Sequence, residues 1–200
     1  MEKLNRLYLV RHGQVVGYEN VPAIGHSDVD ITDEGVRQMQ VIADRLAEKN
    51  IDAIYSSDLQ RSRKGAHIIG KYHDAIVNVV SGFRELWFGD WEGMAFEDIL
   101  DKYPKEVEDR KRNPVHFRAP GSTESVEDLA KRVMDCAKTV FMEHKGNNIV
   151  LVAHGMVNRV ILCNALGLDL KNMIHIHQDY GCLNIIDYYP DHTLVRLVNG

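Results

Sequence analysis

LYLVRHG at residues 7–13 and IVLVAHG at residues 149–155 are two distant stretches of the same shape. Each is a continuous apolar run that ends in a His-Gly pair. Such a run, without polar alternation, is typical of a strand buried on both faces of a sheet. Because the carboxyl ends of parallel strands line the ligand crevice of an open sheet, the repeat predicts two histidines that converge on one ligand. We expect the glycine after each histidine to let the backbone approach an anion closely.

Strand and helix patterns alternate around these stretches, which predicts parallel strands joined by crossover helices. The expected strands are residues 7–10, 53–55, 76–80 and 149–152, followed by a hairpin of 182–188 and 193–198. The expected helices are 32–50, 125–141, 157–166 and one that begins at residues 56–58 and ends near 72. Thr32 and one of residues 56–58 are predicted to cap their helices, and Ser125 with Asp128 resembles a capping box. The predicted fold class is α/β, with three αβα layers and a mostly parallel central sheet covered by helices on both faces.

Length and composition favour one compact unit. The chain has 200 residues with 44% hydrophobic content, which predicts a single domain over residues 1–200. Glycines and prolines interrupt the pattern from about 81 to 123, although residues 95–103 and 105–112 are expected to form short helices. We interpret this segment as a lid-like excursion over one edge of the sheet.

Charge and apolar run lengths exclude several classes of partner. The net charge of −5 argues against a general nucleic-acid binder, because no broad basic face is available for phosphates. No apolar run approaches the roughly 18 residues of a membrane span, so we expect a soluble, cytoplasmic protein without a membrane partner. The three cysteines, Cys136, Cys163 and Cys182, form no CxxC pair and are expected to be small buried hydrophobes rather than metal ligands.

Two arginines are placed to reach the same crevice as the histidines. Arg11 ends the first predicted strand, and Arg61 falls in the first turn of the helix after residues 53–55. A guanidinium presents a planar fork of donors that matches two oxygens of a phosphoryl group. Arg63 and Lys64 turn toward other faces of that helix and are interpreted as solvated charges.

Several further motifs follow in an order that resembles the histidine phosphatase superfamily, in the branch of the cofactor-dependent phosphoglycerate mutases and small phosphatases. Beyond the two His-Gly turns, the similar segments are Gly25-His26-Ser27-Asp28, Ser56-Ser57-Asp58-Leu59 with Arg61, Arg84-Glu85-Leu86, Phe88-Gly89-Asp90-Trp91-Glu92-Gly93, Pro120-Gly121 and Glu124-Ser125. Together they cover nearly the whole chain. The resemblance implies the phosphoglycerate mutase-like fold and phosphomonoester chemistry.

The resemblance also implies a role for each site residue. It makes His12 the nucleophile that is transiently phosphorylated, Glu85 the proton donor, and Arg11, Arg61 and His154 a phosphate clamp. Neither a metal nor a cofactor is implied, since two guanidiniums and a second imidazole can stabilise the charge of the transferred group. Glu92 is a rival proton donor by residue type, but the family uses its Trp-Glu-Gly element structurally.

The chain departs from the family pattern just after the first His-Gly turn. Val15 replaces the usual hydroxyl residue and Tyr18 replaces the usual Asn, so two common phosphate contacts are missing. Gln14 and Asn20 are candidates to compensate, with a plain turn role for Asn20 as an equal alternative. At the other turn, Gly155 and Met156 are expected to contribute to phosphate binding.

Three functions remain open at this stage. The first is a phosphatase for a small soluble phosphate ester. The second is a phosphoglycerate mutase, although the usual larger central insertion and the tail after the last strand are missing. The third is a non-catalytic phospho-ligand binding or regulatory module, although a pure binder would not require a proton donor such as Glu85. The substrate is not identified by the sequence, and a homodimer is left open.

Overall fold

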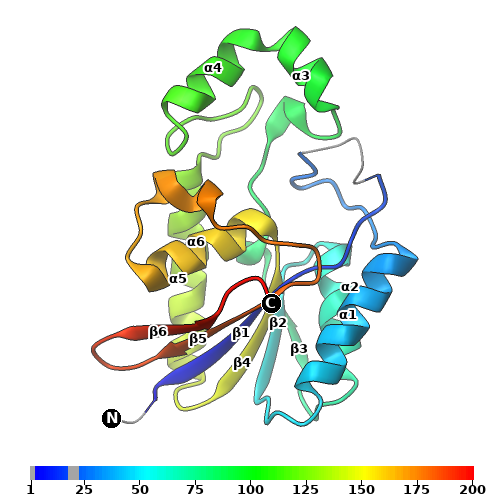
Figure 1. The fold of residues 1–200 in the computed structure, drawn as a ribbon, viewed down its shortest axis with the longest axis vertical. Helices are drawn as coiled ribbons and strands as arrows, with labels where there is room; N and C mark the ends of the chain where they lie inside the picture. Colours follow the sequence, from blue (N-terminus) through cyan, green and yellow to red (C-terminus); the bar gives the residue numbers. More distant parts are fainter. Residues whose placement is uncertain (1–2, 18–22) are drawn as a thin grey trace.

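A computed structural model describes residues 3–17 and 23–200 and places one six-stranded sheet at the centre of the molecule (Figure 1). The strands are β1 (Asn5–Arg11), β2 (Ala53–Ser56), β3 (Val77–Val79), β4 (Asn148–Ala153), β5 (Leu183–Tyr188) and β6 (Thr193–Leu197). Their order is β3-β2-β4-β1-β5-β6, with the first four parallel and the last two antiparallel to their neighbours. The predicted α/β class with a mostly parallel sheet is confirmed.

Helices cover both faces of the sheet, as predicted. The helices are α1 (Asp33–Leu46) and α2 (Gln60–Gly70) on one face and α5 (Val126–Glu143) and α6 (Gly155–Leu166) on the other. Alternate residues of β1 point into the two cores: Leu7 and Leu9 pack with α5 and α6, whereas Tyr8 and Val10 pack with α1 and α2. The unbroken apolar run of β1 is therefore explained, because a strand between two helical layers has no solvent-facing side.

Local capping explains where two of these helices, α1 and α5, begin. The hydroxyl of Thr32 accepts a hydrogen bond from the backbone N–H of Gly35 at 3.0 Å, as predicted for α1. The capping box of Ser125 and Asp128 is also confirmed at the start of α5.

The predicted cap of α2 at residues 56–58 is wrong. Leu59 occupies the cap position without a side-chain hydrogen bond, and the carboxylate of Asp28 accepts from the N–H of Gln60 at 2.7 Å. Asp58 instead accepts from Nε of Arg84 at 2.7 Å. The carboxylate of Asp28, from a distant loop, thus caps α2 in place of the local residue that was expected. The spacing of residues near the helix start could not indicate a cap from so far away.

The segment between β3 and α5 extends beyond the carboxyl ends of the parallel strands (Figure 1). It contains η1 (Ser81–Phe83), η2 (Gly89–Trp91), α3 (Phe96–Lys102) and α4 (Pro104–Arg112), and a last short helix, η3 (Leu170–His175), follows α6. A small core around Trp91, which is 1% exposed, includes Ile99, Val107 and Ala119. In the described part of the chain, no helix combines the length and apolarity that crossing a bilayer requires.

Candidate active site

The two His-Gly turns lie side by side at the carboxyl edge of the sheet. β1 and β4 pair in parallel with Arg11 opposite Ala153, so the next residue of each strand, His12 and His154, emerges at the same place. The two ring centroids are 5.1 Å apart, and both side chains are buried. The convergence predicted from the repeated sequence is therefore what the structure shows.

Each imidazole is held through a different ring nitrogen. Nδ1 of His12 lies 2.8 Å from the carbonyl oxygen of Gly13, which can only accept, so Nδ1 carries the hydrogen and Nε2 keeps its lone pair. In His154 it is Nε2 that is engaged, 2.7 Å from the hydroxyl of Ser57. Nδ1 of His154 is buried and has no hydrogen-bond partner among the described residues.

The environment keeps both imidazoles neutral. Burial lowers the pKa of His12 well below 6.5, and the guanidiniums of Arg61 and Arg11 lower it further. Burial is also the main reason that the pKa of His154 is lowered well below 6.5, with Arg61 the next largest cause. A neutral imidazole with a free Nε2 is the form that can attack phosphorus.

Two guanidiniums flank the histidines, each fixed by backbone carbonyls. Arg61 is 1% exposed and donates from Nη1 to the carbonyl of Ser27 at 2.7 Å and from Nη2 to that of Gly25 at 2.6 Å. Arg11 donates from Nη1 to the carbonyl of Gln178 at 2.6 Å. The Nε atoms of both arginines are buried without a hydrogen-bond partner in the described part of the chain. Together with Nδ1 of His154, three unpaired polar atoms gather around His12, which suits a site that takes an anion.

Glu85 brings a carboxyl group to the same place from the loop after η1. One carboxylate oxygen accepts from the backbone N–H of Leu86 at 2.9 Å, and the other accepts from the N–H of Met156 at 3.2 Å. Met156 lies in the first turn of α6, which begins at Gly155 rather than at the expected Val157. The earlier start matters, since it puts a helix N-terminus, where anions are favoured, next to the histidines.

Glu92, the rival proton donor, has a structural place. Its carboxylate accepts from the backbone N–H groups of His26 at 2.7 Å and Ser27 at 3.1 Å, and from that of Phe88 at 3.2 Å. These bonds tie the loop whose carbonyls receive Arg61 to the segment after Glu85. The structural interpretation of Glu92 thus agrees with its contacts.

A pocket of about 270 Å³ opens at this edge, and Arg11, His12, Arg61, Glu85, Gly155 and Met156 all line it. His154 is not part of the pocket wall and packs against His12. In the described part of the chain, no three His, Cys, Asp or Glu residues gather in a way that could hold a metal ion.

The predicted compensation by Gln14 is not what the structure shows. Its amide oxygen accepts from the hydroxyl of Thr32 at 2.9 Å, and its backbone N–H donates to Gln38 at 2.8 Å, so the side chain supports the start of α1. Asn20 and Tyr18 lie outside the described residues. Val15, fully buried, pairs with Ile31 in an isolated bridge and belongs to the core.

Sequence reasoning missed several residues of the pocket. Tyr180 lines it, and the guanidinium carbon of Arg11 lies 3.8 Å from the Tyr180 ring centroid. Arg110 of α4 and Arg159 of α6 also line it. The pairing of β5 with β1 explains the position of Tyr180: β5 begins beside the end of β1, so the residues just before β5 lie near His12. The sequence pattern predicted the last hairpin but not the strand with which it pairs.

A buried pair of neutral histidines between two arginines, with a carboxyl group and a helix N-terminus at the same edge of an α/β sheet, defines a phosphoryl-transfer enzyme. The sequence profile described as histidine phosphatase superfamily (branch 1) matches residues 7–200. The chain belongs to that family and is a hydrolase of phosphate monoesters.

Individual relatives agree with this assignment. The metal-independent phosphoserine phosphatase of Arabidopsis thaliana is 30% identical over 80% of this chain and 68% of its own length. Phosphoglycerate mutase-like protein 4 of the same plant is 33% identical over 76% and 67%. The crystal structure of the alpha-ribazole phosphatase from Shigella flexneri covers 98% of this chain and 96% of its own, with a TM-score of 0.87 and 24% identity. The last comparison shows that the fold is shared.

Proposed function

We propose that the chain hydrolyses a small soluble phosphomonoester through a phosphohistidine on His12. The observation that carries this proposal is the state of the His12 ring. Its Nδ1–H is held by the carbonyl of Gly13, and its Nε2 lone pair is free in a pocket flanked by Arg11 and Arg61. Burial and the two guanidiniums lower the pKa of His12, so the ring enters the reaction as a nucleophile rather than as a cation.

In the first half-reaction, Nε2 of His12 attacks phosphorus and the bond between phosphorus and the ester oxygen breaks. Glu85, protonated, gives its proton to the departing oxygen, which leaves as an alcohol. In the second half-reaction, the Glu85 carboxylate takes a proton from water while the water oxygen attacks phosphorus. The bond between phosphorus and nitrogen then breaks, inorganic phosphate leaves, and His12 is neutral again.

The surrounding donors stabilise the charge on the transferred group. Arg11 and Arg61 offer guanidinium hydrogens to the equatorial oxygens, and the N-terminus of α6 at Gly155 adds its positive dipole. The ring of His154 contributes one N–H: in the tautomer in which the hydroxyl of Ser57 donates to Nε2, the hydrogen resides on Nδ1, beside His12.

A change of Glu85 to Gln tests the role of the acid. We expect Glu85→Gln to slow hydrolysis of an alkyl ester such as glycerol 3-phosphate by about 10²–10⁴-fold, the usual contribution of general acid catalysis. Formation of 4-nitrophenolate from 4-nitrophenyl phosphate should fall much less in its first turnover, because this leaving group needs no proton. Equal first-turnover rates for wild type and variant on the alkyl ester would remove Glu85 from the mechanism.

The two alternative functions give different results in the same preparation. A mutase would convert 3-phosphoglycerate in the presence of bisphosphoglycerate faster than it releases inorganic phosphate, and that result would replace the phosphatase proposal. A binding module would bind phosphate without hydrolysing 4-nitrophenyl phosphate at any pH from acid to neutral.

A further inference from the structure

Two guanidiniums line the pocket beyond the pair assigned to the phosphate. Arg159 follows Gly155 by one turn of α6 and donates from Nε to the carbonyl of Ile176 at 2.8 Å. Its Nη1 lies 3.3 Å from the position that a Cβ atom on Gly155 would occupy, so the end of the side chain faces the start of the helix. Arg159 is therefore oriented toward the pocket by a backbone carbonyl.

Arg110 reaches the pocket from another element, α4. Its guanidinium carbon lies 5.6 Å from the ring centroid of Phe88 and 5.7 Å from that of Trp91. These rings orient the side chain without using its N–H donors. Within the described residues, no carboxylate forms an ion pair with Arg110 or with Arg159.

The charges in the pocket exceed what a phosphate monoester needs. The dianion of the ester is matched by Arg11 and Arg61, and both histidines are neutral. The proposed mechanism uses Glu85 as the acid in this first step, so it adds no negative charge there. Arg110 and Arg159 then remain as positive charge without a counterpart in a pocket of about 270 Å³, which is a size for a small metabolite.

We propose that Arg110 and Arg159 bind a carboxylate of the substrate, which makes the substrate a small phosphomonoester that also carries a carboxylate. This inference rests on the proposed function. A guanidinium binds a carboxylate through two parallel N–H donors, and two guanidiniums from separate helices fix the position of the carboxylate relative to the phosphate.

Two substrates that differ only in this group provide the test. In 3-phosphoglycerate a carboxylate stands where sn-glycerol 3-phosphate has a hydroxymethyl group. We expect wild type to hydrolyse 3-phosphoglycerate with a kcat/KM about 10- to 100-fold higher, and Arg110→Gln and Arg159→Gln each to reduce this ratio about tenfold. Arg110→Gln removes no hydrogen bond to a described residue, so it stays informative if Arg159→Gln unfolds. Arg112→Gln is the matched control on the same helix, since Arg112 pairs with Glu108 and does not line the pocket.

The possible results separate this inference from the function on which it rests. Equal kcat/KM values for the two substrates in wild type would overturn the carboxylate subsite. A uniform loss on both substrates in the two arginine variants would also overturn it and would assign these arginines to the phosphate. Failure of wild type to hydrolyse either substrate or 4-nitrophenyl phosphate would instead contradict the proposed function.

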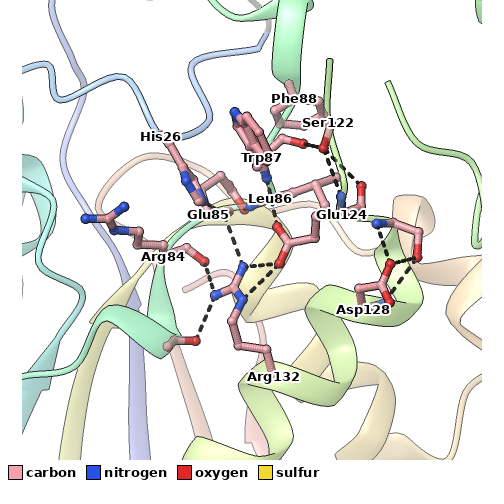
Figure 2. A network of polar contacts seen from close by, with 12 residues as sticks. His26, Arg84, Glu85, Leu86, Trp87, Phe88, Ser122, Glu124, Asp128 and Arg132 are labelled. Atoms are coloured by element: carbon pink, nitrogen blue, oxygen red, sulfur yellow. Dashed lines mark hydrogen bonds and ion pairs between the residues drawn. The ribbon is translucent and has the colours of Figure 1, made fainter. Parts of the chain in front are cut away.

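A separate observation concerns how the loop that carries Glu85 is held (Figure 2). Arg132 of α5 donates from Nη1 to the carbonyls of Gly82 at 2.8 Å and Arg84 at 3.0 Å, and from Nη2 to that of Glu85 at 3.4 Å. Nε and Nη2 also donate to one carboxylate oxygen of Glu124, at 2.9 and 2.7 Å. All five N–H donors of the guanidinium are thus used.

Glu124 completes the connection from the other side of Glu85. Its second oxygen accepts from the backbone N–H of Trp87 at 2.9 Å. The pair Arg132–Glu124 is mostly buried, with side-chain exposures of 26% and 15%. Neither residue lines the pocket, so any effect on the reaction must act through the backbone of residues 82–87.

We infer that Arg132 and Glu124 are positioning residues for Glu85. Glu124→Gln removes the negative charge that pairs with Arg132 but keeps an acceptor for the N–H of Trp87. It therefore weakens the contacts that hold residues 82–87 without removing the side chain. We expect it to lower kcat for glycerol 3-phosphate about tenfold, with little change in KM and a smaller loss in the first turnover of 4-nitrophenyl phosphate. Arg118→Gln, which removes an exposed ion pair with Asp128, is the matched control.

A merely structural role gives another pattern. Equal losses on the alkyl and aryl esters, or a change confined to thermal stability, would contradict a positioning role. If Glu85→Gln itself fails to separate the two esters, the proposed function of Glu85 fails, and that result is distinct from a failure of Glu124→Gln alone.

Discussion

The turn at His12-Gly13 and the turn at His154-Gly155 look alike in the sequence and differ in the structure. After β1 the chain continues as a loop, and the carbonyl of Gly13 holds Nδ1 of His12. After β4 the chain begins a helix at once, and the hydroxyl of Ser57 holds Nε2 of the second histidine. The imidazole of His12 therefore keeps Nε2 for the pocket, whereas His154 stands behind His12 with its Nδ1 buried and unpaired among the described residues.

The glycines differ as much as the histidines. A Cβ on Gly13 would lie 2.2 Å from the carbonyl oxygen of Gly35, so this glycine is required by close packing against the start of α1. The expectation that it serves the approach of an anion is replaced by this contact. Gly155, in contrast, lines the pocket at the first turn of α6, where the helix N-terminus favours an anion. The two matching sequences thus have different functions. The first turn presents the nucleophile, His12, and the second presents the N–H donors at the start of α6.

The largest expected effect is the difference in turnover between variants of the two histidines. His12→Ala should abolish turnover of 4-nitrophenyl phosphate, because no other residue accepts the phosphoryl group. His154→Ala should lower kcat by about 10²–10³-fold, the usual cost of removing one donor from a charge-stabilising site. Steady-state kinetics on both variants measures the difference. Comparable residual activity in the two would mean that the turns do not have separate roles.

Alanine substitutions at the two glycines should differ in their effect on the free energy of unfolding. We expect Gly13→Ala to lower the free energy of unfolding by about 3 kcal/mol, since the new methyl group meets backbone that cannot move easily. Gly155→Ala meets the end of the Arg159 side chain at 3.3 Å and should cost less than about 1 kcal/mol. Urea denaturation followed by circular dichroism gives both values. A larger loss in Gly155→Ala would reverse this assignment.

Acidification should lower the free energy of unfolding, because two histidines are buried in the neutral form. Their pKa values are lowered in the folded state, so below pH 6.5 the unfolded chain binds protons that the folded chain does not. Stability therefore falls as pH decreases from 6.5, by up to about 1.4 kcal/mol per pH unit for each histidine. Urea denaturation between pH 7 and 5, without phosphate, measures the slope. His154→Asn should reduce it, and an unchanged slope would show that His154 titrates normally.

The smallest expected effect tests the hydroxyl that holds only the second histidine. Ser57→Ala should lower kcat about fivefold, since one hydrogen bond worth about 1 kcal/mol orients His154. Ser56→Ala is a matched control, because the neighbouring buried hydroxyl has no partner among the described residues. Equal kinetics for Ser57→Ala and Ser56→Ala would mean that the orientation of His154 does not depend on Ser57.

The sequence was informative where the physics is local or repeated. The apolar runs of β1 and β4 predicted buried parallel strands, and their shared ending predicted the meeting of His12 and His154. Thr32 was identified as a cap because its partner lies three residues away. Local patterns of this kind survive folding, since tertiary contacts reinforce them.

Contacts between distant segments could not be derived in this way. Asp28 caps α2 from a loop more than thirty residues earlier, and Gln14 supports Thr32 instead of the pocket. Arg110 reaches the pocket only because α3 and α4 extend beyond the sheet, as Figure 1 shows. The spacing of residues within α3 and α4 does not indicate where these helices lie relative to the pocket.

The central claim is that His12, and not His154, carries the phosphoryl group. Glu85→Gln mixed with 4-nitrophenyl phosphate should accumulate the intermediate, because the aryl group leaves without an acid while water lacks its base. An alkaline quench followed by proteolysis and mass spectrometry then locates the phosphate. We predict one phosphate on His12, and none on any peptide of His12→Ala. Phosphate on His154, or continued turnover of wild type with no phosphorylated histidine at all, would contradict the account.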